Sequence, residues 1–139
     1  MTIKVETIMS SRVVTIDMDD RLTVAKEIFD NAPFHHLLVT ENNQLQGVLS
    51  ERDFLRALSP HLGQICETER DAETLQKRAH QVMSRKPVTI SPESSIEQAS
   101  EKMLEHGIGS LPVLNNGQLV GIITWKDLLK AFINYDETL

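Results

Sequence analysis

Two hydroxyl residues, Ser50 and Thr124, are each followed three positions later by an aspartate, Asp53 or Asp127. The spacing resembles a helix capping box, in which the hydroxyl accepts hydrogen bonds from the first helical turn and the acid is favoured by the helix dipole. The same residue types could bind a nucleotide. A helix N-terminus with a hydroxyl can hold a phosphate, and an aspartate can accept both hydrogens of a ribose diol. The pattern alone leaves both interpretations open.

Basic side chains accompany the two pairs. Arg52 and Lys126 each precede the aspartate by one position and supply positive charge. His35 and His36 lie upstream of the first pair and can be neutral or charged near neutral pH. These histidines could face an anionic ligand or could simply end a strand in solvent. No cysteine and no third histidine has the spacing of a metal site, so we expect no metal.

The composition sets the class of protein. The chain has 139 residues, a formal net charge of −6 and one cysteine, Cys66. This length predicts one domain, or two very small ones that share a core. A single cysteine excludes an internal disulfide framework. The acidic balance argues against nucleic acid as the main partner and against an anionic membrane surface.

Targeting and catalytic signals are missing from the sequence. No apolar run approaches the length of a membrane-spanning helix, and residues 1–6 lack a hydrophobic signal core, so we expect a cytoplasmic protein. No nucleophile, base and orienting group stand in a recognisable pattern, and there is no phosphate loop of the strand–GxxxxGK type. We therefore expect a protein that is not an enzyme.

The chain repeats itself once, in a register that aligns Met9 with Met83. This register holds without a gap from the first motif to the last helix of each copy, through apolar, turn and charged residues alike. Each copy predicts the order strand, helix, strand, strand, helix. The predicted elements are 13–16, 22–31, 36–40, 45–49 and 50–58 in the first copy, and 88–90, 96–106, 110–114, 119–123 and 124–133 in the second.

The repeat also predicts the domain organisation. We expect the first repeat over residues 1–58, the second over 82–139, and a polar, partly helical linker over 59–81. A copy of about 50 residues buries too little surface to be stable by itself. The two copies should therefore form one pseudo-symmetric α+β unit, with their small sheets packed together.

Each copy resembles a cystathionine β-synthase (CBS) domain. Three motifs carry the resemblance, in the same order in both copies. They are MSRKPVTISP at 83–92, IGSLPVL at 108–114 and GIITWKDL at 121–128, with weaker versions at 9–17, 35–39 and 47–53. The resemblance covers nearly the whole chain, and no attached enzyme, channel or transporter is evident. The chain looks like a stand-alone tandem CBS pair, a Bateman-type module.

This resemblance implies a fold and a function. CBS pairs have two repeats related by a pseudo-two-fold axis, with clefts between them, and commonly pair into homodimers. Many bind AMP, ADP, ATP or S-adenosylmethionine in the clefts, require no cofactor, and act as regulatory sensors for another protein. The sequence does not identify the nucleotide or the regulated protein. The alternative is a dimeric protein-interaction scaffold whose clefts are vestigial.

The resemblance also implies residue roles. It directs Ser50 and Thr124 toward phosphate, and Asp53 and Asp127 toward ribose. The remaining candidates are the strand ends toward the nucleobase and the basic residues toward the phosphates: Thr15, Ile16, Thr89 and Ile90, then His35, His36, Arg52 and Lys126.

The two copies differ at positions that shape the site. The first copy has Leu38 where the second has Pro112, and the second has Gly109 and Ser110 in place of the histidine pair. Pro33 should end the first helix early or kink it. We therefore expect the two clefts to be inequivalent, and one of them could be empty.

Overall fold

The computed structural model describes residues 2–65 and 67–138, so Cys66 lies outside the described residues. Helices and short strands alternate, which confirms the α+β class. The chain divides into two compact units, Val14–Lys86 and Met1–Val13 with Pro87–Leu139. Each unit has its own hydrophobic core.

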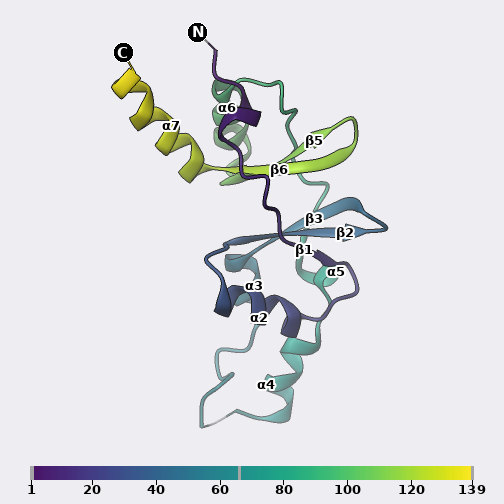
Figure 1. Ribbon diagram of the computed structural model, residues 1–139. Coiled ribbons are helices and arrows are strands. Elements are labelled where there is room, and N and C mark those ends of the chain that lie inside the picture. Colours follow the sequence, from purple (N-terminus) through teal and green to yellow (C-terminus); the bar gives the residue numbers. More distant parts are fainter. Residues whose placement is uncertain (1, 66, 139) are drawn as a thin grey trace. The chain divides into compact units, whose positions relative to one another are not determined.

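The unit Val14–Lys86 is built on a four-stranded sheet of order β1-β2-β3-β4. Strand β1 runs parallel to β2, and the other neighbours are antiparallel. Helices α2 and α3 lie on the same side of the sheet (Figure 1). The elements are β1 (Thr15–Asp17), α2 (Leu22–Asn31), β2 (His36–Glu41), β3 (Gln44–Ser50), α3 (Glu51–Ala57), α4 (Glu69–Glu73), the 3-10 turn η1 (Thr74–Gln76), α5 (Ala79–Val82) and β4 (Ser84–Arg85).

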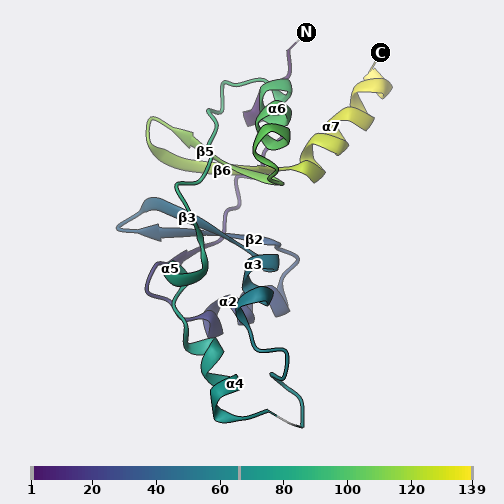
Figure 2. The same cartoon turned by 180° about the vertical axis from the view of Figure 1, so that it is seen from behind.

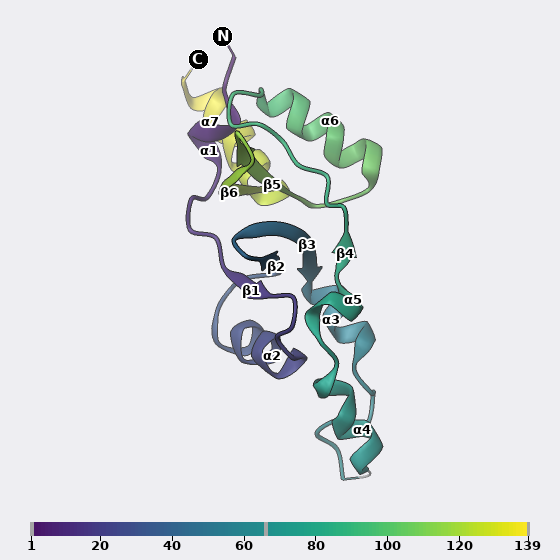
Figure 3. The same cartoon turned by 90° about the vertical axis from the view of Figure 1, so that its right-hand side faces the viewer.

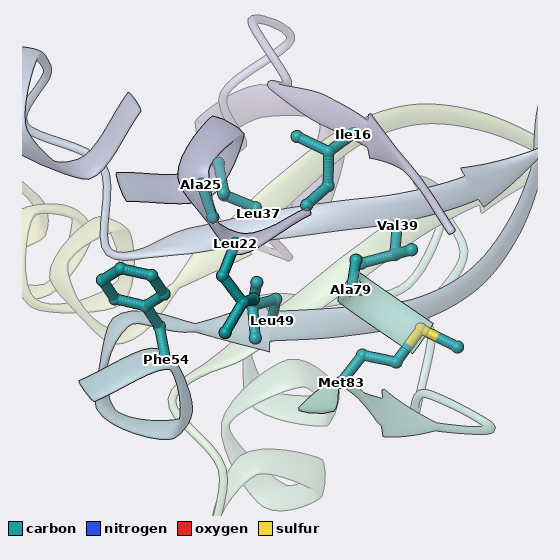
Figure 4. Close-up of a cluster of buried hydrophobic side chains, with 9 residues drawn as sticks. All are labelled: Ile16, Leu22, Ala25, Leu37, Val39, Leu49, Phe54, Ala79 and Met83. Atoms are coloured by element: carbon teal, nitrogen blue, oxygen red, sulfur yellow. The ribbon is translucent and has the colours of Figure 1, made fainter. Parts of the chain in front are cut away.

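Apolar residues from the sheet and from helices α2, α3 and α5 meet in one core (Figure 4). Leu22 and Ala25, three residues apart on α2, are fully buried against the sheet residues Leu37 and Leu49. Helix α2 ends at Asn31, as expected with Pro33 two positions further along. The β2–β3 turn uses two left-handed residues, Asn42 and Asn43, which is the backbone of a tight hairpin.

The second unit contains a two-stranded hairpin with helices around it. Helix α6 lies over the hairpin, and α7 leads away from the end of β6 (Figure 2). Its elements are α1 (Val5–Ile8), α6 (Ile96–His106), β5 (Ser110–Asn115), β6 (Gln118–Thr124) and α7 (Trp125–Thr138). The predicted bounds of the helices at 22–31 and 96–106 are therefore the observed ones.

The strand predicted at 88–90 is reduced to a single bridge between Ile90 and Val113. In the first repeat, the Leu38 N–H donates to the Val14 carbonyl oxygen at 3.1 Å and extends the ladder. The related residue of the second repeat is Pro112, which has no N–H. This proline therefore removes the hydrogen bond that would have made residues 88–90 a regular strand.

The first segment of each repeat packs in the unit of the other repeat. Ser10 exchanges two backbone hydrogen bonds of 2.9 Å with Ile122, and Ser84, its counterpart in the second repeat, lies opposite Val48 in the antiparallel β3–β4 pairing. Figure 3 shows α1 beside β6, and α5 beside β3 and β4. The compact units therefore do not coincide with the sequence repeats on which the boundaries 1–58, 59–81 and 82–139 rest.

Glycines allow the first segment of each repeat, here called the exchanged segment, to pack against a strand of the other repeat. A Cβ atom at Gly47 would lie 2.6 Å from both the Met83 sulfur and the Ser84 carbonyl oxygen. At the related position, a Cβ at Gly121 would lie 2.7 Å from the sulfur of Met9. Only glycine lets the exchanged segment approach the strand this closely.

Candidate functional site

The junction between β3 and α3 assembles most of the predicted residues of the first repeat. Ser50 is the N-cap of α3, and its hydroxyl oxygen accepts a hydrogen bond of 3.0 Å from the Asp53 N–H. His36 lies opposite Ser50 in the β2–β3 pairing. The Glu51 N–H donates to the His35 carbonyl oxygen at 2.8 Å, which fixes the histidine pair beside the start of the helix.

The electrostatics of this junction centre on His36. Burial lowers the pKa of His36, and the adjacent His35 lowers it further, while Asp53 acts in the opposite direction. The neutral imidazole is therefore favoured at His36. His35 is more exposed, and its Nδ1 atom lies 3.9 Å from a carboxylate oxygen of Glu51. Arg52 is exposed on the outer side of the helix.

A depression of about 400 Å³ opens next to Asp53, entirely within the unit Val14–Lys86. Its polar lining consists of Asp53, Arg56, Lys77 and Gln81. The sequence analysis did not identify the last three residues. Arg56 could have been found from its position one helical turn after Asp53, but nothing in the sequence places residues 77 and 81 beside α3.

The second repeat builds the related junction differently. The Thr124 N–H and hydroxyl both donate to one carboxylate oxygen of Asp127, at 2.9 and 3.2 Å. The first repeat thus forms the hydroxyl half of a capping box, and the second forms the carboxylate half. Asp127 is engaged by its own cap, so a ligand would have to compete with Thr124 for this carboxylate.

Trp125 is a second difference between the β6–α7 junction and the β3–α3 junction. Its ring lies against Gly109, where an added Cβ would be 3.1 Å from the ring carbon Cδ1. The Lys126 ammonium lies 5.9 Å from the centre of the same ring, which is a cation–π distance. Ser110, which replaces His36, is buried. This junction therefore carries an aromatic ring where the first carries a histidine pair.

The strand residues predicted to meet a nucleobase lie away from the histidines. Thr15 pairs with Leu38 and Ile16 with Val39, two or more positions along β2 from His36. The side chains of Ile16 and Ile90 are buried in the two cores, so only their backbone could contact a ligand. The Thr89 carbonyl oxygen accepts a hydrogen bond of 2.7 Å from the Lys102 ammonium.

No group of three or more histidine, cysteine, aspartate or glutamate residues among residues 2–65 and 67–138 could hold a metal ion. Within the same part of the chain, no helix is long and apolar enough to cross a membrane.

Comparison with known proteins finds the same domain twice in this chain, as the internal repeat predicts. The family model for the CBS domain matches residues 5–60 and 79–134. A CBS domain-containing protein of Dictyostelium discoideum is 35% identical over 99% of this chain and 96% of its own length. Other relatives are longer, and this chain spans only 12% to 41% of three of them.

Solved structures share the fold. The CBS domain of a CBS domain-containing membrane protein from Sphaerobacter thermophilus has a TM-score of 0.77 and 34% identity, covering 93% of this chain and 87% of that one. The CBS domain pair of protein MJ0100 has a TM-score of 0.81 and 20% identity, covering 97% and 99%. That pair is described in complex with 5′-methylthioadenosine and S-adenosyl-L-methionine.

Proposed function

Because this chain belongs to the CBS domain family, we propose that it is a regulatory module that binds an adenosine-containing nucleotide. Binding would change its shape or its affinity for a partner protein. The observation that carries this proposal is the junction of His36, Ser50 and Asp53, where donor, acceptor and titratable groups converge at a strand end. Convergent polar groups beside an apolar core are typical of small-molecule sites.

The chemistry of each residue supports a role toward the nucleotide. Asp53 has a carboxylate that can accept both ribose hydroxyls, and its N–H is already satisfied by Ser50. In the second repeat, Asp127 and Thr124 have the same functional groups, although they bond to each other. Basic side chains next to the junctions, His35 and Arg52 in the first repeat and Lys126 in the second, would add positive charge that favours an anionic ligand.

The candidate ligands are AMP, ADP, ATP and S-adenosylmethionine. A CBS pair of the same fold, MJ0100, is described with S-adenosylmethionine and 5′-methylthioadenosine, which puts adenosine compounds among the ligands to test. We propose a regulatory rather than a catalytic role, because a ribose-binding carboxylate and phosphate-binding cations explain the polar groups of the junction. No cofactor is required for this role.

We also propose that the chain forms a homodimer through α7. Four large apolar side chains, Trp125, Leu129, Phe132 and Ile133, are between 50% and 68% exposed on this helix. Their spacing puts them on one face. An exposed apolar face of this kind is typical of an interaction surface. A second copy can cover it, because a two-fold axis pairs the same patch on both subunits.

A thermal-shift panel tests the proposed function. AMP, ADP, ATP and S-adenosylmethionine are each added at millimolar concentration. GTP is the comparison ligand without adenosine, and NADH is a larger dinucleotide that contains adenosine. A ligand present at 100 times its dissociation constant stabilises the protein by about 2.7 kcal/mol. For a chain of this size the midpoint should rise by several degrees, on the order of 5–10 °C. A lack of any shift would instead favour the scaffold with vestigial clefts.

Substitution of the aspartates makes the test specific. Asp53→Asn and Asp127→Asn keep an oxygen acceptor but remove the charge that holds a ribose diol. Asp71 is a matched control. It forms a capping box with Thr68, the N-cap of α4, at the same three-residue spacing, and it is assigned no role in binding. The shift should be lost in at least one of the first two variants and kept in Asp71→Asn.

A further inference from the structure

The depression beside Asp53 combines side chains from two separate parts of the unit Val14–Lys86. Asp53 and Arg56 lie three residues apart on α3 and so share one face of that helix. Lys77 and Gln81 come from the segment around α5, which contacts α3. A space of about 400 Å³ is thus bounded by one carboxylate, two cations and one amide.

The two cations are available to an anion. Lys77 donates one hydrogen bond to the Ala57 carbonyl oxygen at 3.0 Å, and this contact holds its ammonium at the C-terminal end of α3. The ammonium has two further N–H donors, and the Arg56 guanidinium has five. Among the described residues, neither side chain takes part in an ion pair. Two formal positive charges here face one negative charge, in a chain whose net charge is −6.

We propose that this depression receives the phosphate end of the nucleotide, with Arg56 and Lys77 as phosphate ligands. The inference rests on the proposed function, in which Asp53 holds the ribose. Arg56 lies about one helical turn beyond Asp53, so one face of α3 presents a ribose acceptor and then a phosphate donor. Gln81 adds an uncharged donor from the opposite wall.

The consequence is selectivity for phosphorylated ligands. Guanidinium and ammonium groups form strong charge-assisted hydrogen bonds with phosphate. The neutral methylthio group of 5′-methylthioadenosine gains nothing from them. The methionine end of S-adenosylmethionine has one carboxylate but also a sulfonium and an ammonium, so its net charge is positive and it gains less from two cations than a phosphate does. The depression therefore favours AMP, ADP or ATP in this unit.

The internal repeat supplies a matched control. In the register that aligns Met9 with Met83, Arg56 corresponds to Lys130, whereas Lys77 corresponds to Ile3. The second repeat thus keeps one of the two cations and has an apolar residue in place of the other. Lys130→Gln removes a helix-surface cation at the related position without touching the depression.

The test measures binding of AMP and of 5′-methylthioadenosine by isothermal titration calorimetry on the full chain. The two compounds share adenosine and differ in whether a phosphate is present. The variants are Arg56→Gln, Lys77→Gln and Lys130→Gln, each checked for an unchanged circular dichroism spectrum. We expect Arg56→Gln and Lys77→Gln each to weaken AMP binding about tenfold or more, and to leave 5′-methylthioadenosine binding unchanged.

Any other outcome contradicts the assignment of Arg56 and Lys77 as phosphate ligands. Equal weakening of both ligands would mean that the substitutions act through the fold, and would overturn the assignment. Unchanged AMP affinity in Arg56→Gln and Lys77→Gln, or the same loss in Lys130→Gln, would also overturn it while the proposed function stands. If the unmodified chain binds neither compound, this inference fails, whereas the proposed function fails only if ADP, ATP and S-adenosylmethionine do not bind either.

Discussion

The packing of residues 79–85 against β3 makes Gly47→Ala a sharp test of the fold. The new methyl group would lie 2.6 Å from the Met83 sulfur and 2.6 Å from the Ser84 carbonyl oxygen. Both distances are about 0.8 Å shorter than the lower limit of ordinary contact, 3.4 Å. The sulfur ends a flexible side chain and can move. The carbonyl oxygen belongs to the backbone next to the Gly47–Arg85 pairing, so β4 itself must shift.

Overpacking of this kind costs about 2 kcal/mol. A chain of this length has an unfolding entropy of about 0.3 kcal/mol per degree, so Tm should fall by about 7 °C. The assay is thermal unfolding followed by circular dichroism. Gly63→Ala is the control, because nothing lies within 4 Å of its added methyl group and only its left-handed backbone, with φ of 80°, is strained. That strain costs about 1 kcal/mol, or about 3 °C.

The result that would refute this reasoning is a Tm loss in Gly47→Ala no larger than that in Gly63→Ala. It would mean that Met83 and Ser84 do not pack closely against Gly47 of β3. Gly121→Ala provides a second reading of the same packing, because its methyl group would meet the Met9 sulfur at 2.7 Å and the Ser10 carbonyl oxygen at 2.8 Å. We expect its Tm to fall by a similar amount.

Three other predictions concern single side chains. Val5 is fully buried, so Val5→Ala should lower Tm by about 7 °C, the equivalent of about 2 kcal/mol; a change below about 1 °C would contradict the packing of α1 in that core. The pKa of His36 lies below 6.5, mainly through burial. Its neutral form therefore favours folding, and this stability is lost as the pH falls below about 6.5 through the folded-state pKa. The Tm should drop more between pH 8 and pH 5 in the unmodified chain than in His36→Gln, and equal drops would contradict it. Leu129→Asp should convert a homodimer to a monomer of half the mass in light scattering; an unaffected dimer would exclude α7 as the interface.

Local sequence patterns were sufficient to predict the helices at 22–31 and 96–106. The helical spacing of apolar residues in 22–31 and in 96–106 is a signal that lies within one stretch of chain. The strand at 88–90 was predicted from β-branched residues, and this prediction was wrong. The residue that lies opposite this stretch is Pro112, which has no N–H to donate to it. Because Pro112 is far along the chain, the residues at 88–90 give no sign that this hydrogen bond is missing.

The site was only partly predictable for the same physical reason. Ser50 and Asp53 are three residues apart, so their contact follows from helical geometry. Lys77 reaches α3 only because the segment around α5 packs in the unit of the first repeat, and neither composition nor periodicity encodes that long-range partner. The burial of Ile16 was likewise a property of the assembled core.

The most direct test of nucleotide binding is a calorimetric titration of the full chain with AMP, ADP, ATP and S-adenosylmethionine. Asp53→Asn, Asp127→Asn and the capping control Asp71→Asn are measured under the same conditions. The account predicts saturable binding of at least one of these ligands, lost in Asp53→Asn or Asp127→Asn and retained in Asp71→Asn. Absence of heat with all four ligands, or binding that survives the removal of both site carboxylates, would contradict it.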